Sequence, residues 1–253
     1  MRLSKKVSIV TGASAGLGAS VAARFAREGS MVVAADRNET GGIALIEHLQ
    51  NQGQNATFVR TDIADEHSVK CLVDATLARY GRIDVLFNNA GILLAGQDLP
   101  AHELRLEIWD AVLNVNLRGP FLCAKHTIPH MINQGGGSIV NVCSRTGLFG
   151  CAPKLTAYST SKAALISLTR VMAAAYASHN IRVNAIIPGT MDTPMNNYLF
   201  ASDLARERYR SAIPMGRLGS GEDIEGLALF LASGESKYCT GGLYMCDGGV
   251  TAV

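Results

Sequence analysis

Residues 7–18 read VSIVTGASAGLG, and this stretch decides the fold. Its first five residues form a short, largely apolar run that is typical of a buried strand. Gly12, Gly16 and Gly18 then permit a tight turn and a close approach of the backbone to a ligand. The helical pattern that follows places free N–H groups and a positive dipole end at this turn. Because the loop stands between a first strand and its helix, nucleotide binding is favoured over an ordinary glycine turn.

Apolar runs and amphipathic stretches alternate along the rest of the chain. Fully apolar strands that alternate with helices are typical of a parallel sheet covered on both faces. We therefore expect a doubly wound Rossmann-type α/β fold with a parallel seven-stranded sheet. Strands are expected at 7–11, 31–35, 56–59, 83–87, 138–142, 181–187 and 243–245, and helices around 21–26, 43–49, 65–79, 103–132, 155–178 and 222–232.

Nothing in the sequence divides the chain into separate folding units. It has no linker, repeat or low-complexity tract, so a single domain over residues 1–253 is expected. Residues of about 1–115 would form the cofactor half and about 116–253 the catalytic and substrate half. Within the second half, about 190–215 would form a lid over the substrate.

Composition excludes several classes of protein. Hydrophobic residues make up 48% and charged residues 17%, which excludes a disordered chain. Lys and Arg number 23 against 21 Asp and Glu, a net charge of +2 that is too small for a nucleic-acid-binding surface. No apolar stretch is long enough for a membrane span or a signal peptide, so we expect a cytoplasmic protein. The six cysteines are expected to be reduced packing residues, and no cysteine or histidine cluster indicates a metal site.

An acidic residue ends the second expected strand and bears on the choice of cofactor. Asp36 stands 18 residues after Gly18, where a carboxylate accepts hydrogen bonds from the adenosine ribose of NAD. The 2′-phosphate of NADP would face this carboxylate, at a cost of up to about 4 kcal/mol before screening. Arg37 is the complication, because a guanidinium reaches a 2′-phosphate well, but the glycine loop itself contains no Lys or Arg. NAD is therefore favoured, with Arg37 interpreted as lying beside the adenine.

A tyrosine and a lysine four residues apart are candidate catalytic residues. Tyr158 and Lys162 begin a helical pattern and share one of its faces. Ser144 follows the expected strand 138–142, and ligands of doubly wound sheets bind beyond the carboxyl ends of such strands.

With these residues in place, the chain resembles the short-chain dehydrogenase/reductase family over its whole length. TGASAGLG (11–18) is similar to the cofactor loop of that family, NNAG (88–91) to the segment after its fourth strand, and TGG…CDGG (240–249) to its closing segment. The resemblance implies a catalytic tetrad of Asn116, Ser144, Tyr158 and Lys162. It also implies a cofactor site formed by Gly12, Ser14, Gly16, Leu17, Gly18, Asp36, Arg37, Asp62, Ile63, Asn89, Ala90, Gly91, Tyr158, Lys162, Pro188, Gly189, Met191 and Thr193.

The chain departs from the family pattern at two places, and two assignments stay open. Fourteen residues separate Ser144 from Tyr158, one more than is commonest, and Cys143 replaces a frequent serine. Asn114 competes with Asn116 for the tetrad position, and Asp62 is equally suited to a turn or helix cap.

The family chemistry requires a tyrosine that releases or accepts a proton near neutral pH. An unperturbed tyrosine has a pKa near 10, so a shift of about 3 units, or about 4 kcal/mol, is needed. Lys162 and a positively charged nicotinamide are expected to supply it. Ser144 would hydrogen-bond the substrate oxygen, and Asn116 would hold a water on a proton path to solvent.

The expected substrate region is mostly apolar. Ile92–Leu94, Leu148, Phe149 and the aromatic residues of the lid favour a cyclic or medium-sized alcohol or ketone. Arg145 is interpreted as facing solvent, with a carboxylate-binding role as the alternative.

Three functions remain in competition. The leading one is an NAD-dependent secondary alcohol dehydrogenase or ketone reductase. The others are a 3-oxoacyl-[acyl-carrier-protein] reductase and a nucleotide-sensing protein without turnover. The alanine-rich helices and the family resemblance imply a homotetramer.

Overall fold

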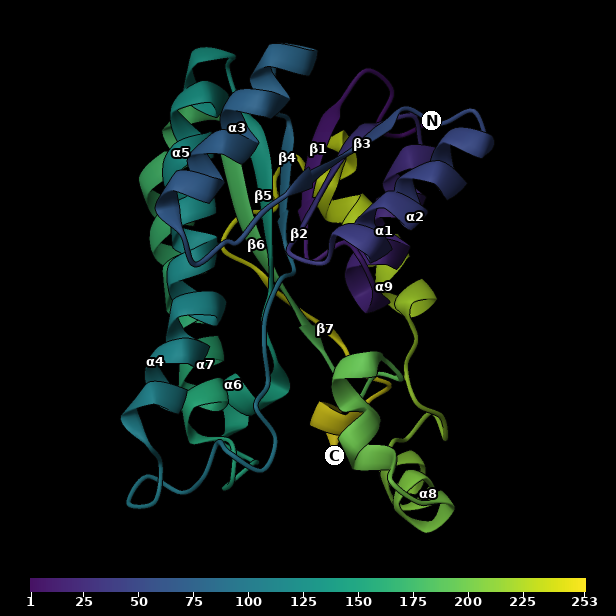
Figure 1. Ribbon diagram of the computed structural model, residues 1–253, viewed down its shortest axis with the longest axis vertical. Coiled ribbons are helices and arrows are strands. Elements are labelled where there is room, and N and C mark those ends of the chain that lie inside the picture. Colours follow the sequence, from purple (N-terminus) through teal and green to yellow (C-terminus); the bar gives the residue numbers. More distant parts are fainter.

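All seven expected strands are present in the computed structural model, which describes residues 1–253, and they form one parallel sheet (Figure 1). The strand order β3-β2-β1-β4-β5-β6-β7 places the first strand next to the fourth, which is the doubly wound arrangement. The sequence prediction of the fold class is confirmed. The strands are β1 (Val7–Thr11), β2 (Met31–Asp36), β3 (Ala56–Arg60), β4 (Val85–Asn88), β5 (Gly137–Val142), β6 (Ile181–Pro188) and β7 (Leu243–Cys246).

Helices cover both faces of the sheet (Figure 1). Alternate strand residues point to opposite faces, so Val32 and Ala34 of β2 belong to one core, and Val33 and Ala35 belong to the other. The first core is closed by α1 (Gly16–Arg27), α2 (Glu39–Asn51) and α9 (Gly221–Ala232). The second is closed by α3 (Glu66–Tyr80), α5 (Gly119–Asn133) and α7 (Thr156–Tyr176).

The helical stretch expected over residues 103–132 is present as one continuous run with a change of winding in its middle. It consists of α4 (Leu106–Leu113), a π-helical turn at Asn114–Arg118, and α5. The apolar pattern of this stretch does not distinguish an α-helix from one that contains an extra residue. Within the turn, the Asn116 amide makes two hydrogen bonds to the main chain of Ile92, and these bonds hold the bulge in place.

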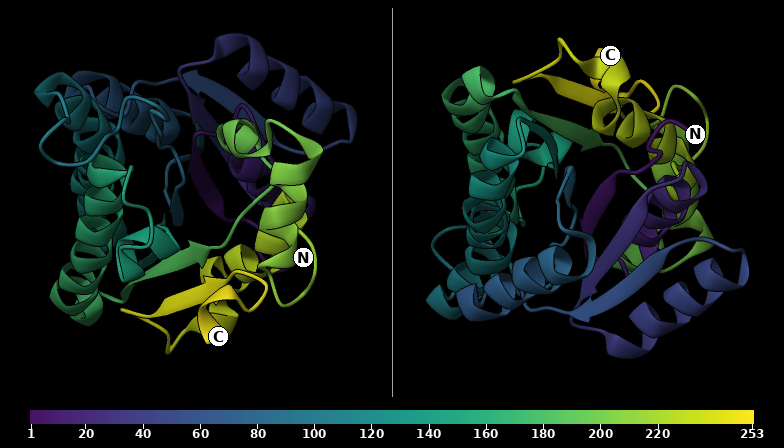
Figure 2. Two further views of the ribbon diagram at one scale, coloured as in Figure 1. Left: turned by 90° about the horizontal axis from the view of Figure 1, so that it is seen from below. Right: turned by 90° about the horizontal axis from the view of Figure 1, so that it is seen from above.

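The segment expected to form the lid contains two helical elements. A 3₁₀ turn at Pro194–Phe200 is followed by α8 (Asp203–Ser211), and the residues after α8 contact the loop that follows β7. There the Met215 N–H donates to the Gly248 carbonyl at 3.1 Å. Figure 2 shows this green segment beside the yellow C-terminal residues. A short helix, α6 (Arg145–Phe149), which the sequence did not indicate, lies between β5 and α7.

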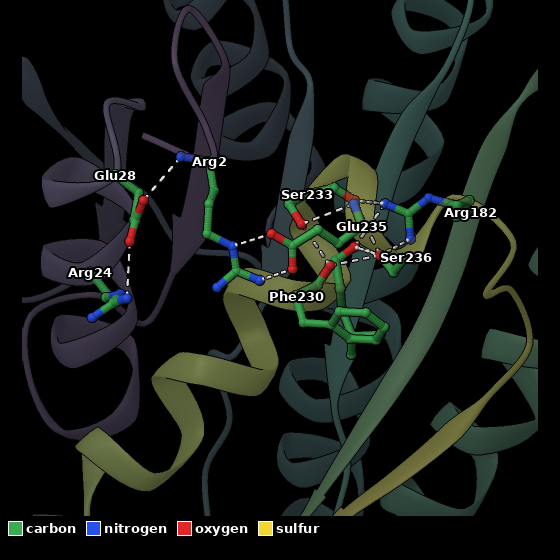
Figure 3. A network of polar contacts seen from close by, with 9 residues as sticks. Arg2, Arg24, Glu28, Arg182, Phe230, Ser233, Glu235 and Ser236 are labelled. Carbon is green, nitrogen blue, oxygen red and sulfur yellow. Dashed lines mark hydrogen bonds and ion pairs between the residues drawn. The ribbon is translucent and has the colours of Figure 1, made fainter.

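A polar network joins the carboxyl ends of α1 and α9 to the first residues of the chain and to the start of β6 (Figure 3). The Arg2 guanidinium binds Glu235 after α9, and its backbone N–H donates to Glu28 at 2.9 Å. Arg182 of β6 donates to Ser236 and to the Ser233 carbonyl of the same turn. These bonds secure the edge of the sheet opposite the carboxyl ends of the strands. None of the helices is long and apolar enough to cross a lipid bilayer.

Candidate active site

A cavity of about 1190 Å³ lies at the carboxyl ends of the strands. The glycine loop forms one end of it, and residues that follow β5, the start of α7 and the lid form the other. Parallel strands bring their carboxyl ends to one edge, which explains why residues distant in the sequence meet here.

The glycine loop is held by the segment after β4. Gly12 has φ +66°, and a Cβ there would lie 2.7 Å from the Ala90 Cα. A Cβ on Gly18 would collide with the Gly12 carbonyl oxygen. The Asn89 side-chain amide donates to the carbonyl oxygens of Thr11 and Gly12, both at 3.0 Å. Only glycine fits this close approach, so the loop needs glycine at both position 12 and position 18.

The amino end of α1 is free for an anionic ligand. Its N-cap is Ala15, no side chain caps it, and its first turn contains no acidic residue. The N–H groups of the first turn therefore have no acceptor within the helix. This arrangement, on the wall of the cavity, fits the pyrophosphate of a dinucleotide.

Asp36 ends β2 and also lines the cavity. One carboxylate oxygen accepts the Ser14 N–H at 3.0 Å, and the other accepts the Asn38 N–H at 2.9 Å. Arg37 is exposed, and its Nε lies 3.6 Å from an Asp62 carboxylate oxygen. Asp62 also accepts the Ala64 N–H at 3.0 Å, so it has the turn-capping contact that its sequence position allows.

Ser144, Tyr158 and Lys162 line the opposite part of the cavity. Ser144 is the N-cap of α6, and Tyr158 and Lys162 lie on the first turns of α7. Lys162 is buried, and its Nζ donates to the Val142 carbonyl at 2.7 Å and lies 5.8 Å from the centre of the Tyr158 ring. A Cβ on Gly147 would lie 2.6 Å from the backbone nitrogen of Ala163, so glycine allows α6 to pack against this turn of α7.

Burial shifts the pKa values of both catalytic candidates. It raises the pKa of Tyr158 to about 12, and a hydrogen bond with Ser144 opposes this only in part. Burial also lowers the pKa of Lys162. The lowered tyrosine pKa that the family chemistry requires is therefore not supplied by the residues around Tyr158 alone.

Asn116 is fully buried and does not line the cavity. Its Oδ1 accepts the Ile92 N–H at 2.7 Å, and its Nδ2 donates to the Ile92 carbonyl at 2.9 Å and to Ser161 Oγ at 3.2 Å. The Ser161 hydroxyl in turn donates to the Tyr158 carbonyl at 2.7 Å. Asn116 thus connects the segment after β4 to the catalytic helix, and its water-holding role remains a prediction.

Most of the site residues expected from the sequence meet in this cavity. Those that line it are Gly12, Ser14, Gly16, Leu17, Asp36, Asn89, Ala90, Gly91, Ser144, Tyr158, Lys162, Pro188, Gly189, Met191 and Thr193. Those that do not are Gly18, Arg37, Asp62, Ile63 and Asn116. The Ile63 side chain packs instead into the second core, against α5 at Gly119.

Sequence reasoning missed Asp98, which lies in the segment between β4 and α4. This carboxylate has no exposed surface, and it accepts the N–H groups of Ala157 at 2.9 Å and Tyr158 at 2.8 Å. The N-cap residue of α7 is Leu155, which has no capping side chain. Asp98 therefore caps the catalytic helix from a distant loop. The missing cap at residue 155 is the only sequence signal that points to such a partner.

Arg145 is placed differently from the sequence interpretation. It is half-buried and lines the cavity instead of facing solvent. Lys154 and Arg208 also line it, so the substrate end of the cavity is less apolar than expected.

Comparisons with known proteins agree with this architecture. A family model described as Enoyl-(Acyl carrier protein) reductase matches residues 12–251. The 3-oxoacyl-[acyl-carrier-protein] reductase FabG of Thermotoga maritima is 41% identical, covering 99% of each chain. The cis-4-hydroxycyclohexanecarboxylate dehydrogenase of Sinomonas cyclohexanicum is also 41% identical, covering 98% of each chain.

A solved structure gives the same fold with a nucleotide present. The chain is similar to a protein described as an NAD(P)-dependent gluconate 5-dehydrogenase from Beutenbergia cavernae with bound NADP, with a TM-score of 0.93 and 34% identity. The two match over 99% of this chain and 98% of the other. Fold, motifs and relatives agree over nearly the whole length: the chain belongs to the short-chain dehydrogenase/reductase family and is an oxidoreductase.

Proposed function

We propose that this protein interconverts a secondary alcohol and a ketone, with NAD as the hydride carrier and Tyr158 as the general acid and base. The observation that carries the proposal is the cavity in which Ser144, Tyr158 and Lys162 face the glycine loop. In the reducing direction, the Tyr158 hydroxyl donates its proton to the carbonyl oxygen, and Ser144 hydrogen-bonds that oxygen. In the oxidising direction, Tyr158 accepts the proton of the alcohol.

Lys162 is the cation nearest to Tyr158, since its Nζ lies 5.8 Å from the centre of the tyrosine ring. A protonated Lys162 would favour the phenolate form of Tyr158. A bound oxidised nicotinamide supplies the hydride acceptor and a second positive charge. Together, these charges would bring Tyr158 toward a pKa suited to proton transfer near neutral pH.

The dinucleotide would be held by the glycine loop, the free amino end of α1 and Asp36. Asp36 supports the choice of NAD, because its carboxylate lines the cavity and is fixed by two backbone N–H groups. A 2′-phosphate beside this fixed charge would be repelled, whereas ribose hydroxyl groups would donate to it. Arg37, which lies near Asp62, is not directed at Asp36.

The substrate proposed is a cyclic or medium-sized alcohol with an apolar body. Leu93, Leu155 and Leu199 line the cavity near the catalytic residues. The relative from Sinomonas cyclohexanicum, whose name gives a hydroxyl group on a cyclohexane ring, supports this class.

The test is nicotinamide absorbance with a panel of cyclic, aromatic and aliphatic secondary alcohols, each with NAD and with NADP. We expect Tyr158→Phe to reduce turnover by at least about 100-fold while cofactor binding, measured by calorimetry, is retained. Tyr176→Phe, at the far end of α7, is the matched control and should keep full turnover. Equal turnover by Tyr158→Phe would refute the proposal and leave a nucleotide sensor as the better interpretation.

The alternative function is reduction of 3-oxoacyl groups on an acyl carrier protein. The similarity to FabG of Thermotoga maritima supports it. A kcat/KM for 3-oxoacyl thioesters that exceeds the value for every free alcohol and ketone would favour this alternative.

We also propose that the protein is a homotetramer. Apolar side chains on the outer helices support this, since Leu106 of α4, Phe121 of α5 and Val171 of α7 are 73%, 45% and 62% exposed. Sedimentation that gives a monomer at micromolar concentration would refute it.

A further inference from the structure

The charges along the cavity are unequally distributed. Asp36, at the end that would hold the adenosine, is the only carboxylate among the residues that line it. The other end is lined by Arg145, which follows Ser144, by Lys154 before α7, and by Arg208 on the lid helix α8. Besides Lys162, three cations therefore line the part of the cavity where the substrate would lie.

These three cations are not neutralised by the protein. Other arginines of the lid region all have carboxylate partners: Arg206 pairs with Asp192, Arg210 with Glu207, and Arg217 with Asp223. Arg208, between two of them on the same helix, forms no ion pair, and neither does Arg145 or Lys154. Arg208 and Lys154 are exposed, whereas Arg145 is half-buried. The paired arginines differ from Arg208 in where they lie, since they line a separate groove outside the cavity.

Arg145 is the most constrained of the three. It is half-buried, and the nearby carboxylate whose pKa it helps to lower is Asp247. Asp247 forms no direct ion pair with Arg145, and its oxygens accept hydrogen bonds from Gly249 and from the backbone and hydroxyl of Thr251. A half-buried guanidinium without a direct partner is costly, and an anion from outside the chain would compensate for it.

We propose that Arg145 and Arg208, assisted by Lys154, bind the carboxylate of the substrate, so that the preferred substrate is a hydroxy- or oxo-carboxylate with an apolar middle. This inference rests on the proposed alcohol–ketone chemistry and names its substrate class. The cofactor phosphates do not explain the cluster, because the glycine loop and the free end of α1 form the phosphate-binding end. The carboxylate would lie at the lid, the apolar body between the leucines, and the reacting hydroxyl at Ser144 and Tyr158.

The experiment compares 4-hydroxycyclohexanecarboxylate with its methyl ester and with cyclohexanol. We expect kcat/KM for the carboxylate to exceed that for the ester by about 10-fold or more, from charge-assisted hydrogen bonds to one or two guanidinium groups. Arg145→Gln and Arg208→Gln should remove most of this preference, by raising KM for the carboxylate much more than KM for the ester. Arg210→Gln, whose charge is paired with Glu207 on the same helix, is the control and should retain the preference.

Each outcome decides the proposal. Equal kcat/KM for carboxylate and ester would overturn the carboxylate site while leaving the alcohol–ketone function intact. A higher kcat/KM for acyl thioesters on an acidic carrier protein than for the free carboxylate would also overturn it. If no alcohol is turned over, the proposed function fails, and calorimetry decides the anion site separately. Carboxylate binding that is weakened by Arg208→Gln but not by Arg210→Gln would then support the site, and no binding would overturn it.

Discussion

Asp98→Ala is the substitution that tests how the catalytic helix is held in place. Asp98 belongs to a loop after β4, yet it caps α7 by accepting the N–H groups of Ala157 and Tyr158. The cap is closed to water, since Asp98 has no exposed surface. A change here acts on both the stability of the catalytic helix and the position of Tyr158.

The expected magnitude follows from the two donors that the substitution would leave without an acceptor. Each buried, unpaired N–H costs about 1–3 kcal/mol, so the pair gives about 2–6 kcal/mol. The alanine variant no longer buries a carboxylate, which reduces this cost. We therefore expect a loss of about 3 kcal/mol in the free energy of unfolding. For a domain of this size, the melting temperature should fall by about 6–12 °C. Asp98→Asn keeps one acceptor oxygen and should lose about half as much.

Urea unfolding and thermal melting followed by circular dichroism measure the loss. Glu103→Ala is the control, because Glu103 is an exposed carboxylate that pairs only with the exposed His102, and it should change stability by less than about 0.5 kcal/mol. We also expect kcat to fall more than cofactor affinity in Asp98→Asn, because the cap touches Tyr158 and not the glycine loop. An Asp98→Ala protein within about 1 kcal/mol of the unaltered chain would refute the reasoning.

Three further predictions concern the cofactor, the catalytic tyrosine and a helix cap. Asp36→Ala should raise the ratio of kcat/KM for NADP to that for NAD by roughly 100-fold, since it removes the charge that repels a 2′-phosphate, and an unchanged ratio in steady-state kinetics would contradict this. Because the pKa of Tyr158 is raised to about 12 in the folded chain, the folded state holds its proton more tightly than the unfolded state. The free energy of unfolding should therefore fall by roughly 2 kcal/mol more in the unaltered chain than in Tyr158→Phe between pH 10 and 12. Urea unfolding measures it, and the same pH dependence in both proteins would contradict the prediction. Asp223 completes the capping box of α9, and the Arg217 guanidinium holds the pKa of its carboxyl well below its usual range. Asp223→Asn should lower stability by about 1–2 kcal/mol at pH 7, a difference that shrinks as acid protonates Asp223 in the unaltered chain, and thermal melts at pH 7 and at low pH measure both values.

The sequence was sufficient to predict the sheet because its strands are marked by local composition. The run 181–187, for example, is buried on both faces, and the observed strand ends only one residue later, at Pro188. The position of Ser144 followed from the strand before it, since ligands of doubly wound sheets bind beyond the carboxyl ends of the strands. The family resemblance supplied the expectation that Tyr158 and Lys162 join it, and all three residues line one cavity.

What the sequence could not predict depends on contacts between distant residues. Asp98 is an ordinary loop carboxylate until α7 is placed against it, 59 residues later in the chain. The direction of Arg145 depends on how α6 packs, and α6 had no sequence signal of its own. The upward pKa shift of Tyr158 arises from burial by several elements together, which no spacing of residues can reveal.

The π-helical turn at Asn114–Arg118 has a consequence for how the chain tolerates insertions and deletions. A turn of this kind contains one residue more than an α-helix of the same path. Because the turn absorbs the extra residue, removing one residue would restore regular winding without turning α4 away from the core, and Ile108 and Val112 would stay buried. The loss would fall on Asn116, since the Ile92 backbone would lose the amide that holds it. The length of this helical segment is thus set by the site beneath it, and variation in length is easier to accommodate in the exposed residues of the loop that precedes α4.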